Sequence, residues 1–248
     1  MVFLEGVNLS KHFGGLAAVS DVSFYLGSGE IVGLIGTNGA GKTTLFNLIS
    51  GIYAPDHGFV NFEGKKISNI RPHRIARMGI ARTFQLMKPF GTMTVLENAM
   101  IGNLFGESGT INLKIAREEA LKAIEFVNLI NKTDMPVESL TSPDAKKLEL
   151  ARALASKPRV LLLDEVMAGL NPFEVTEAMK LLQKVRNDMG ISIFMVEHIM
   201  ESVMGISDRV IVLSNGKKIA EGTPEQVCND PVVIESYLGE QAEEKAEC

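Results

Sequence analysis

Short apolar runs alternate along this chain with longer segments whose apolar residues recur at helical spacing. Residues 31–35, 160–163 and 191–196 are almost entirely apolar, which is typical of strands buried on both faces of a parallel sheet. Residues 144–156 and 172–189 carry patterns that predict helices. Buried strands that alternate with helices indicate an α/β domain around a mixed or parallel sheet.

The N-terminal part of the chain has a different pattern. Residues 3–13 and 19–26 predict two strands, the second with alternating apolar and polar positions. Residues 59–67 predict a hairpin that turns at Glu63-Gly64. We therefore expect an antiparallel β part ahead of the main helical segments.

Strand patterns are lost after residue 86, where Ala116, Ala120, Ile124 and Val127 repeat at helical spacing. We interpret this segment as a helical subdomain inserted into the α/β core. The expected organisation is one domain at residues 1–238, with the helical subdomain at about 86–157, and an acidic, disordered tail at residues 239–248.

Composition narrows the possible functions. The chain has 248 residues, of which 46% are hydrophobic, so it can bury a large core. The net charge of −5 disfavours a nucleic-acid partner, which usually requires a basic face. The two cysteines, Cys228 and Cys248, favour a reducing compartment over a disulfide framework. We find no signal-peptide pattern, and no apolar run approaches the roughly 20 residues that span a bilayer.

A glycine-rich loop follows the first buried strand and precedes an apolar helical stretch. It consists of Gly36, Thr37, Asn38, Gly39, Ala40, Gly41, Lys42, Thr43 and Thr44. The loop fits G-x-x-x-x-G-K-[ST], and its strand–loop–helix setting supports a phosphate-binding loop. Its N–H groups and the helix N-terminus would face a polyphosphate. Lys42 would reach the β- and γ-phosphates, and the hydroxyl of Thr43 would bind Mg²⁺.

Candidate catalytic side chains follow three of the predicted strands. Asp164 follows the apolar run at 160–163. In ATPases with a phosphate loop, a carboxylate at this position binds Mg²⁺ together with the hydroxyl of the loop. Glu165, the next residue, could act as the general base. Alternatively, this pair only caps the following helix.

Gln85 follows a predicted strand at residues 80–84 and offers an amide to the metal or the attacking water. His198 follows the predicted strand at 191–196 and could donate a hydrogen bond to a γ-phosphate oxygen or to the water. Taken alone, neither of these two residues would identify a site.

In their order along the chain, these motifs resemble the ATP-binding cassette (ABC) family over nearly the whole sequence. The matching positions are an aromatic residue at Phe13, the phosphate loop, Gln85, a signature stretch at 140–144, Asp164-Glu165, a loop at 168–171 and His198. Finer similarity to the branched-chain amino-acid importers of that family occurs at residues 13–16, 82–85, 93–98, 168–172, 196–198 and 233–239.

The resemblance implies a P-loop NTPase fold that binds ATP and Mg²⁺ and hydrolyses ATP. It implies catalytic roles for Lys42, Gln85, Glu165 and His198, and metal binding by Thr43, Gln85 and Asp164. It also implies nucleotide contacts by Phe13, Val19 and the phosphate loop at 36–44, and by Thr141 toward the nucleotide of a second subunit.

The resemblance further implies partners, namely transmembrane permease subunits, a second nucleotide-binding subunit and, indirectly, a periplasmic or extracellular substrate-binding protein. We expect an energy-coupling ATPase of a branched-chain amino-acid importer, peripheral on the cytoplasmic face of the cell membrane. Lipopolysaccharide or lipid export, urea or amide import, and a non-transport nucleotide-dependent clamp are the alternatives. Leu86, Met87, Phe90 and Met93 suit either a permease-docking surface or the core of the helical subdomain.

One stretch departs from the family pattern. The family signature is Leu-Ser-Gly-Gly-Gln, and the corresponding stretch here is Leu140-Thr141-Ser142-Pro143-Asp144. Pro143 replaces a glycine whose N–H faces the partner's nucleotide, and proline has no N–H. Loss of one donor to a charged group costs about 1.5–3 kcal/mol. We therefore hypothesise that this chain supplies a weak half-site to a second, different cassette subunit.

Overall fold

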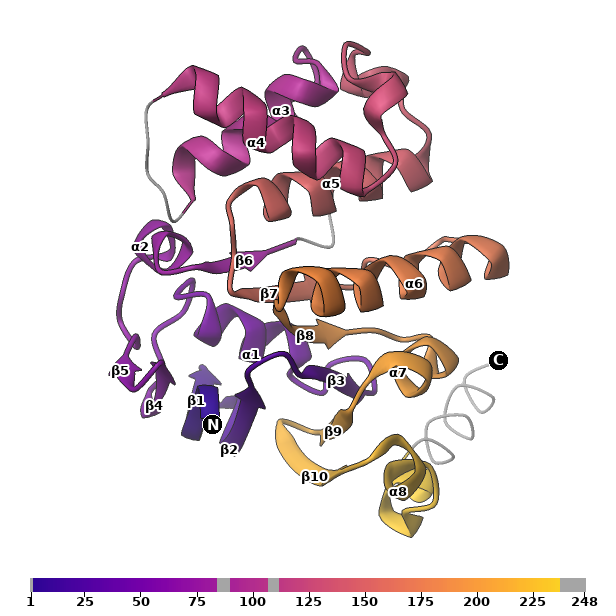
Figure 1. Cartoon of the computed structure of the whole chain (residues 1–248). Coiled ribbons are helices and arrows are strands. Elements are labelled where there is room, and N and C mark those ends of the chain that lie inside the picture. The colour runs from indigo at the N-terminus through magenta and orange to yellow at the C-terminus, as the bar shows by residue number, and fades with distance from the viewer. Residues whose placement is uncertain (1, 84–89, 107–111, 237–248) are drawn as a thin grey trace. The chain divides into compact units, whose positions relative to one another are not determined.

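The computed structural model describes residues 2–83, 90–106 and 112–236 (Figure 1). The chain forms two compact units, one of residues 1–70 and 192–248 and the other of residues 71–191. Each unit carries part of the predicted site, so the two are described in turn. None of the helices in the described ranges has the length and apolar character that a membrane crossing requires.

The first unit contains an antiparallel sheet with the strand order β2-β1-β4-β5. The strands are β1 (Val2–Phe13), β2 (Leu16–Gly27), β4 (His57–Phe62) and β5 (Lys65–Lys66). Between β4 and β5, Glu63 and Gly64 have φ angles of 50° and 73°. Two positive φ angles give a turn whose twist matches that of a hairpin. The predicted antiparallel β part and its turn are confirmed.

The same unit contains a second group of strands, in the order β10-β9-β3-β8. They are β3 (Ile31–Gly36), β8 (Ser192–Val196), β9 (Arg209–Ser214) and β10 (Lys217–Gly222). β3 runs parallel to β8 and β9, while β9 and β10 form an antiparallel hairpin. β3 and β8 are buried along their whole length, as their apolar runs predict. Helices α1 (Lys42–Ile49), α7 (Met200–Ile206) and α8 (Pro224–Cys228) also belong to this unit.

Aromatic packing fixes α1 in the core of the first unit. The ring centroid of Phe194 on β8 lies 5.3 Å from that of Phe46 on α1 and 5.2 Å from that of Phe24 on β2. All three side chains are buried. Such ring pairs contribute roughly 0.5–1.5 kcal/mol beyond their burial. The start of α1, where the phosphate loop ends, is thereby held against the strands.

The second unit contains a pair of parallel strands flanked by helices. These elements are α2 (Pro72–Arg77), β6 (Ile80–Arg82), β7 (Val160–Asp164) and α6 (Pro172–Met189). β7 is buried throughout, as predicted. α6 begins at a capping box between Asn171 and Glu174 and ends at Gly190, whose φ is 67°. Its predicted bounds are confirmed. They could be predicted because both ends of the helix carry clear sequence signals.

Three further helices of this unit pack on one another (Figure 1). They are α3 (Val95–Phe105), α4 (Leu113–Phe126) and α5 (Ser142–Ala155), and the short 3₁₀ helices η1 (Ile130–Lys132) and η2 (Val137–Ser139) lie between α4 and α5 in the chain. α3 and α5 approach closely at Gly102, where a Cβ atom would lie 1.9 Å from the carbonyl oxygen of Arg152. α5 begins at Ser142 rather than at the predicted residue 144, because proline is tolerated in a first helical turn.

Candidate functional site

The phosphate loop connects β3 to α1 and wraps around its own lysine. Lys42 is only 6% exposed, and its Nζ donates to the carbonyl oxygens of Gly36 and Thr37 at 2.6 and 2.8 Å. Gly41 occupies the N-cap position of α1, where no side chain caps the helix. A helix N-terminus without a side-chain cap favours an anionic ligand, since its N–H groups and its dipole attract negative charge.

Main-chain contacts from distant parts of the first unit brace this loop. The N–H of Gly216, in the β9–β10 turn, donates to Ala40 at 3.0 Å, and the carbonyl of Gly216 accepts from Ser20 at 2.8 Å. Gly41 has a φ of 101°, and a Cβ atom there would lie 2.3 Å from the carbonyl oxygen of Ala18. Only glycine meets both demands. The shape of the loop is therefore set by β2 and by the β9–β10 turn.

Phe13 and Val19, the other nucleotide contacts predicted in this unit, differ in exposure. Phe13, at the end of β1, is 43% exposed, whereas Val19 in β2 is fully buried in the core. The ring of Phe13 meets that of Tyr53 edge-on, with 5.2 Å between centroids, and Lys11 Nζ lies 5.8 Å from its centroid. A half-exposed aromatic ring is suited to stacking on a base. Tyr53 was not predicted, because an isolated tyrosine after a helix matches no motif.

His198 leaves the strands at the same edge as the phosphate loop. β3 and β8 pair in parallel, with Ile31 opposite Ile193 and Leu34 opposite Val196. The carboxyl ends of parallel strands lie at one edge, where ligands of such sheets bind. The exposed His198 follows β8 as the phosphate loop follows β3. The predicted placement of His198 thus agrees with the strand pairing.

Asp164 ends β7 in the second unit and is 3% exposed. Its Oδ2 accepts a hydrogen bond from Arg82 Nη2 at 2.8 Å, and its N–H donates to Thr83 Oγ1 at 3.1 Å. Arg82 reaches it because β6 and β7 pair Arg82 with Leu162. Oδ1 of Asp164 is buried and has no hydrogen-bond partner within the described part of the chain. A buried carboxylate oxygen without a donor is costly unless another ligand binds it. Arg82 was not predicted as a partner of this carboxylate, because it matches no catalytic motif.

Glu165 begins the loop that connects β7 to α6, with a φ of 53°. Its carbonyl oxygen accepts from the N–H of Ala168 at 3.3 Å. Lys146 of α5 also holds this loop, since its Nζ donates to the carbonyl oxygens of Val166, at 3.1 Å, and of Ala168. α6 is capped by Asn171, so Asp164 and Glu165 do not cap that helix.

Thr141 is the N-cap residue of α5 and is exposed. Its Oγ1 donates to Oδ2 of Asp144 at 2.9 Å, and the same oxygen accepts from Lys132 Nζ. Burial acts to raise the pKa of Asp144, but the hydrogen bonds from Lys132 and Thr141 outweigh it and hold the pKa below its usual value. The start of the signature helix is thus fixed by a charged network within the chain.

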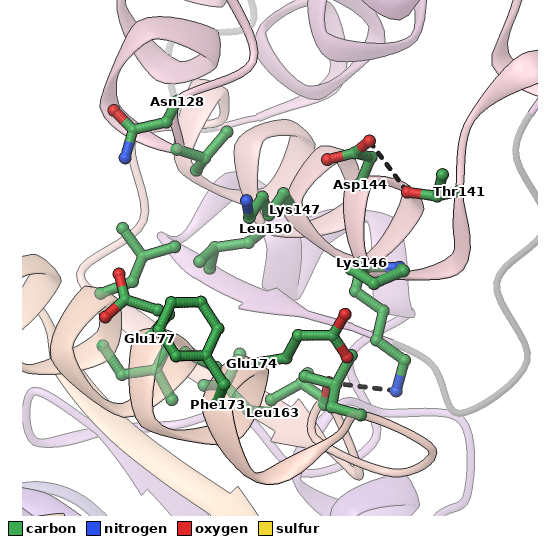
Figure 2. Close-up of a pocket in the computed structure, with 17 residues that line it drawn as sticks. Asn128, Thr141, Asp144, Lys146, Lys147, Leu150, Leu163, Phe173, Glu174 and Glu177 are labelled. Atoms are coloured by element: carbon green, nitrogen blue, oxygen red, sulfur yellow. Dashed lines mark hydrogen bonds between the residues drawn. The ribbon is translucent and has the colours of Figure 1, made fainter.

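A cavity of about 420 Å³ lies in the second unit between α5 and α6 (Figure 2). Its lining is mainly apolar, with Leu150, Leu163 and Phe173 among the residues, but it also includes Lys146 and Glu174. This volume suits a small molecule. However, Lys146 already donates to the loop after β7, and Glu174 accepts from the N–H at the start of α6. We assign no ligand to this cavity.

The predicted site residues are divided between the two units. Phe13, Val19, the phosphate loop at 36–44 and His198 belong to the first unit, and Thr141, Asp164 and Glu165 belong to the second. Gln85, Leu86 and Met87 lie outside the described residues, and Phe90 is 51% exposed. Within the first unit, the pairing of β3 with β8 places the phosphate loop and His198 at the same strand edge. That residues of both units contact one nucleotide is still a prediction.

Two family models match the chain. The model described as ABC transporter matches residues 19–168, and the model described as branched-chain amino acid ATP-binding cassette transporter matches residues 217–243. The first match contains the phosphate loop, Asp164 and Glu165. The second begins at the first residue of β10 and contains the whole of that strand.

Known proteins resemble the chain over nearly its full length. The high-affinity branched-chain amino acid transport ATP-binding protein LivG of Salmonella typhimurium is 41% identical, covering 94% of this chain and 96% of LivG. A probable LivG of Archaeoglobus fulgidus is 40% identical over 98% of both chains. The lipopolysaccharide export system ATP-binding protein LptB of Haemophilus influenzae is 37% identical over 97% of this chain and 99% of LptB.

Solved structures agree with this result. A nucleotide-free ATP-binding cassette from an ABC transporter superposes with a TM-score of 0.87 at 33% identity, covering 96% of this chain and 99% of the other. A cassette solved in its ADP conformation gives a TM-score of 0.88 at 34% identity, with the same coverage. The predicted α/β P-loop NTPase fold is confirmed by these similarities.

Proposed function

This chain belongs to the ABC transporter family, and we propose that it is the ATP-hydrolysing, energy-coupling subunit of an importer of branched-chain amino acids. The observation that carries the proposal is the match of residues 217–243 to branched-chain amino acid cassettes, in a chain 41% identical to LivG. The uncapped N-terminus of α1 supports the nucleotide half of the proposal.

ATP binding starts at the phosphate loop. The N–H groups of the loop and of α1 hold the polyphosphate, and the half-exposed Phe13 stacks on the adenine. Lys42 exchanges its bonds to the carbonyls of Gly36 and Thr37 for bonds to the β- and γ-phosphates. Because Lys42 is buried, its charge acts at a lower dielectric than a surface lysine would, which strengthens its attraction for phosphate.

The residues at the end of β7 fit the binding of Mg²⁺. Oδ1 of Asp164 is buried and lacks a partner within the described ranges, while Arg82 holds Oδ2. Mg²⁺ prefers oxygen ligands, and carboxylate, hydroxyl and amide oxygens all qualify. We propose Asp164, Thr43 and Gln85 as the residues that hold it. When bound, the ion neutralises charge on the β- and γ-phosphates.

Glu165 and His198 then act on the attacking water and the γ-phosphate. Water attacks the γ-phosphorus in line, its proton passes to the Glu165 carboxylate, and ADP leaves. His198 donates a hydrogen bond to a γ-phosphate oxygen. The shared edge of β3 and β8 supports this role, because it places His198 and the phosphate loop at the carboxyl ends of neighbouring strands.

The proposed partners are two transmembrane permease subunits and a second cassette, with a substrate-binding protein acting through the permease. The chain would be peripheral on the cytoplasmic face of the membrane. Thr141 would face the nucleotide of the second cassette. Residues 86–93, which include the exposed Phe90, would contact the permease. Closure of two cassettes on ATP would shift the permease between its states.

The test is to purify the tagged chain from native membranes with whatever subunits accompany it. We expect permease subunits, and ATP hydrolysis that rises when leucine, isoleucine or valine is supplied with the substrate-binding protein. Glu165→Gln is the matched variant, since it keeps the shape of the side chain but removes the base. It should bind ATP normally and lower hydrolysis by about 10²-fold or more. Normal hydrolysis by this variant would refute the role of Glu165.

The same purification distinguishes amino-acid import from the main alternative, which is lipopolysaccharide export. The 37% identity to LptB is the observation that favours this alternative. ATP hydrolysis by the purified complex is therefore also measured with lipopolysaccharide. If it responds to lipopolysaccharide and not to branched-chain amino acids, the proposed cargo is wrong and the ATPase assignment still holds.

A further inference from the structure

The main chain at Glu165 adopts a conformation that is unfavourable for a side-chain-bearing residue. Its φ of 53° lies in the left-handed region, where the Cβ atom crowds the following carbonyl. Such a residue keeps this conformation only when its surroundings hold it. Since this residue is also the proposed general base, the contacts that hold its backbone help to set the direction of its carboxylate.

The strand side of Glu165 is held through its neighbour. The N–H of Asp164 donates to Thr83 Oγ1 at 3.1 Å, and the side chain of Asp164 accepts from Arg82. These bonds fix the last residue of β7 against β6. These bonds lie on the strand side of Glu165, and other contacts hold the loop that follows it.

The loop side of Glu165 is held by Lys146. Its Nζ donates to the carbonyl oxygens of Val166, at 3.1 Å, and of Ala168. Figure 2 shows this side chain extending from α5, with a dashed line to the main chain of the loop. Lys146 is partly buried against the cavity, so water competes less for its donors than at an open surface. One charged group thus joins two carbonyls that follow the strained residue closely in the chain.

We propose that Lys146 is a positioning residue for hydrolysis, holding the loop at 165–168 so that Glu165 points at the attacking water. The inference rests on the proposed function, because it assumes that Glu165 is the base. Lys146 lies on the helix that begins at Thr141, the residue proposed to face the partner's nucleotide. Movement of this helix, when the second cassette binds, would therefore be transmitted to Glu165 through Lys146.

The test compares three full-length variants purified with their membrane subunits. Lys146→Met removes the donors but keeps the apolar stem, and Lys146→Arg restores donors that can reach two carbonyls. Lys147→Met is the matched control, since Lys147 also lines the cavity. We measure the ATP concentration dependence of hydrolysis, and amide hydrogen exchange of the peptide covering residues 164–171.

For Lys146→Met we expect kcat about tenfold lower, a KM for ATP within about twofold of the parent, and faster exchange confined to the loop. Lys146→Arg should recover most of both properties, and Lys147→Met should match the parent. Parental kcat in Lys146→Met, or equal losses in Lys146→Met and Lys147→Met, would overturn the inference. Amide exchange of the loop as slow in Lys146→Met as in the parent would also overturn it. This measurement needs no ATP hydrolysis, so it tests the role of Lys146 even if the proposed function fails.

Discussion

At the scale of single residues, Asp56 anchors the end of β1, which carries Phe13. Its oxygens accept from Lys11 Nζ at 2.8 Å and from the N–H of His12 at 2.7 Å, and these bonds lower its pKa from 3.8 to about 2. A carboxylate with a depressed pKa stabilises the fold above its unfolded pKa, and this contribution is lost as the pH falls through the folded pKa. We expect Asp56→Asn to lower the urea midpoint at neutral pH, with a difference that shrinks as the pH falls from 3.8 toward about 2.

The control for this prediction is Lys11→Met, which removes the strongest of the interactions that lower the pKa of Asp56. In that background Asp56→Asn should change the urea midpoint less, since the two residues interact directly. A midpoint difference that does not vary with pH would contradict the assignment of the stabilisation to the charged carboxylate.

A candidate site residue could be predicted from the sequence only where it belongs to a motif of neighbouring residues. The phosphate loop and Asp164-Glu165 are contiguous motifs next to apolar strands, so residue order alone indicates them. Arg82 and Lys146 have no such motif. Arg82 reaches Asp164 because two strands pair, and Lys146 reaches Val166 because a helix lies against a loop. Tertiary contacts of this kind are invisible without the fold.

At the scale of elements, the start of α5 carries a prediction about the signature stretch. Pro143 lies in the first turn of α5, where a helix does not use the N–H that proline lacks. The fold therefore tolerates Pro143, but a nucleotide on the partner subunit would lose a donor. We expect Pro143→Gly and Pro143→Ala both to raise ATP turnover of the purified complex by about tenfold or more, because both restore an N–H.

Comparison of the two variants separates the donor from backbone flexibility. Glycine makes the unfolded chain more flexible than alanine does, at a cost of about 0.4–1 kcal/mol, so Pro143→Gly should lower the thermal midpoint more than Pro143→Ala. Unchanged turnover in both variants would argue against a weak half-site, and with it against the reason for expecting a different second cassette.

Elements with signals at both ends were predicted most accurately. α6 has a capping box at Asn171 and a glycine at its end, and its predicted bounds agree with the structure. β6 was predicted to continue to residue 84, but the strand ends at Arg82. Thr83 still donates its N–H to the carbonyl oxygen of Leu162 at 3.0 Å, so contact with β7 continues one residue beyond the strand. The residues from 84 to 89 lie outside the described structure.

At the scale of the whole molecule, each of the two units holds some of the residues of the proposed site. Lys42 and His198 belong to the first unit, and Asp164 and Glu165 to the second. A ligand that contacts residues of both units binds only when both units are folded, so its binding energy stabilises the chain as a whole. Under the proposed function, ATP with Mg²⁺ would contact residues of both units, whereas ATP alone would rely mainly on the phosphate loop.

We therefore expect Mg·ATP to raise the thermal midpoint of the Glu165→Gln protein, which does not consume the nucleotide, more than ATP with a chelator does. At a ligand concentration about 100 times Kd, the stabilisation is about 2.7 kcal/mol, or roughly 5–10 °C for a chain of this size. Adding Asp164→Asn should abolish the Mg²⁺-dependent part and retain the remainder, because the phosphate loop is unchanged. Differential scanning calorimetry measures each shift. Equal shifts with and without Mg²⁺ in the Glu165→Gln protein would mean that Asp164, at the end of β7, takes no part in nucleotide binding.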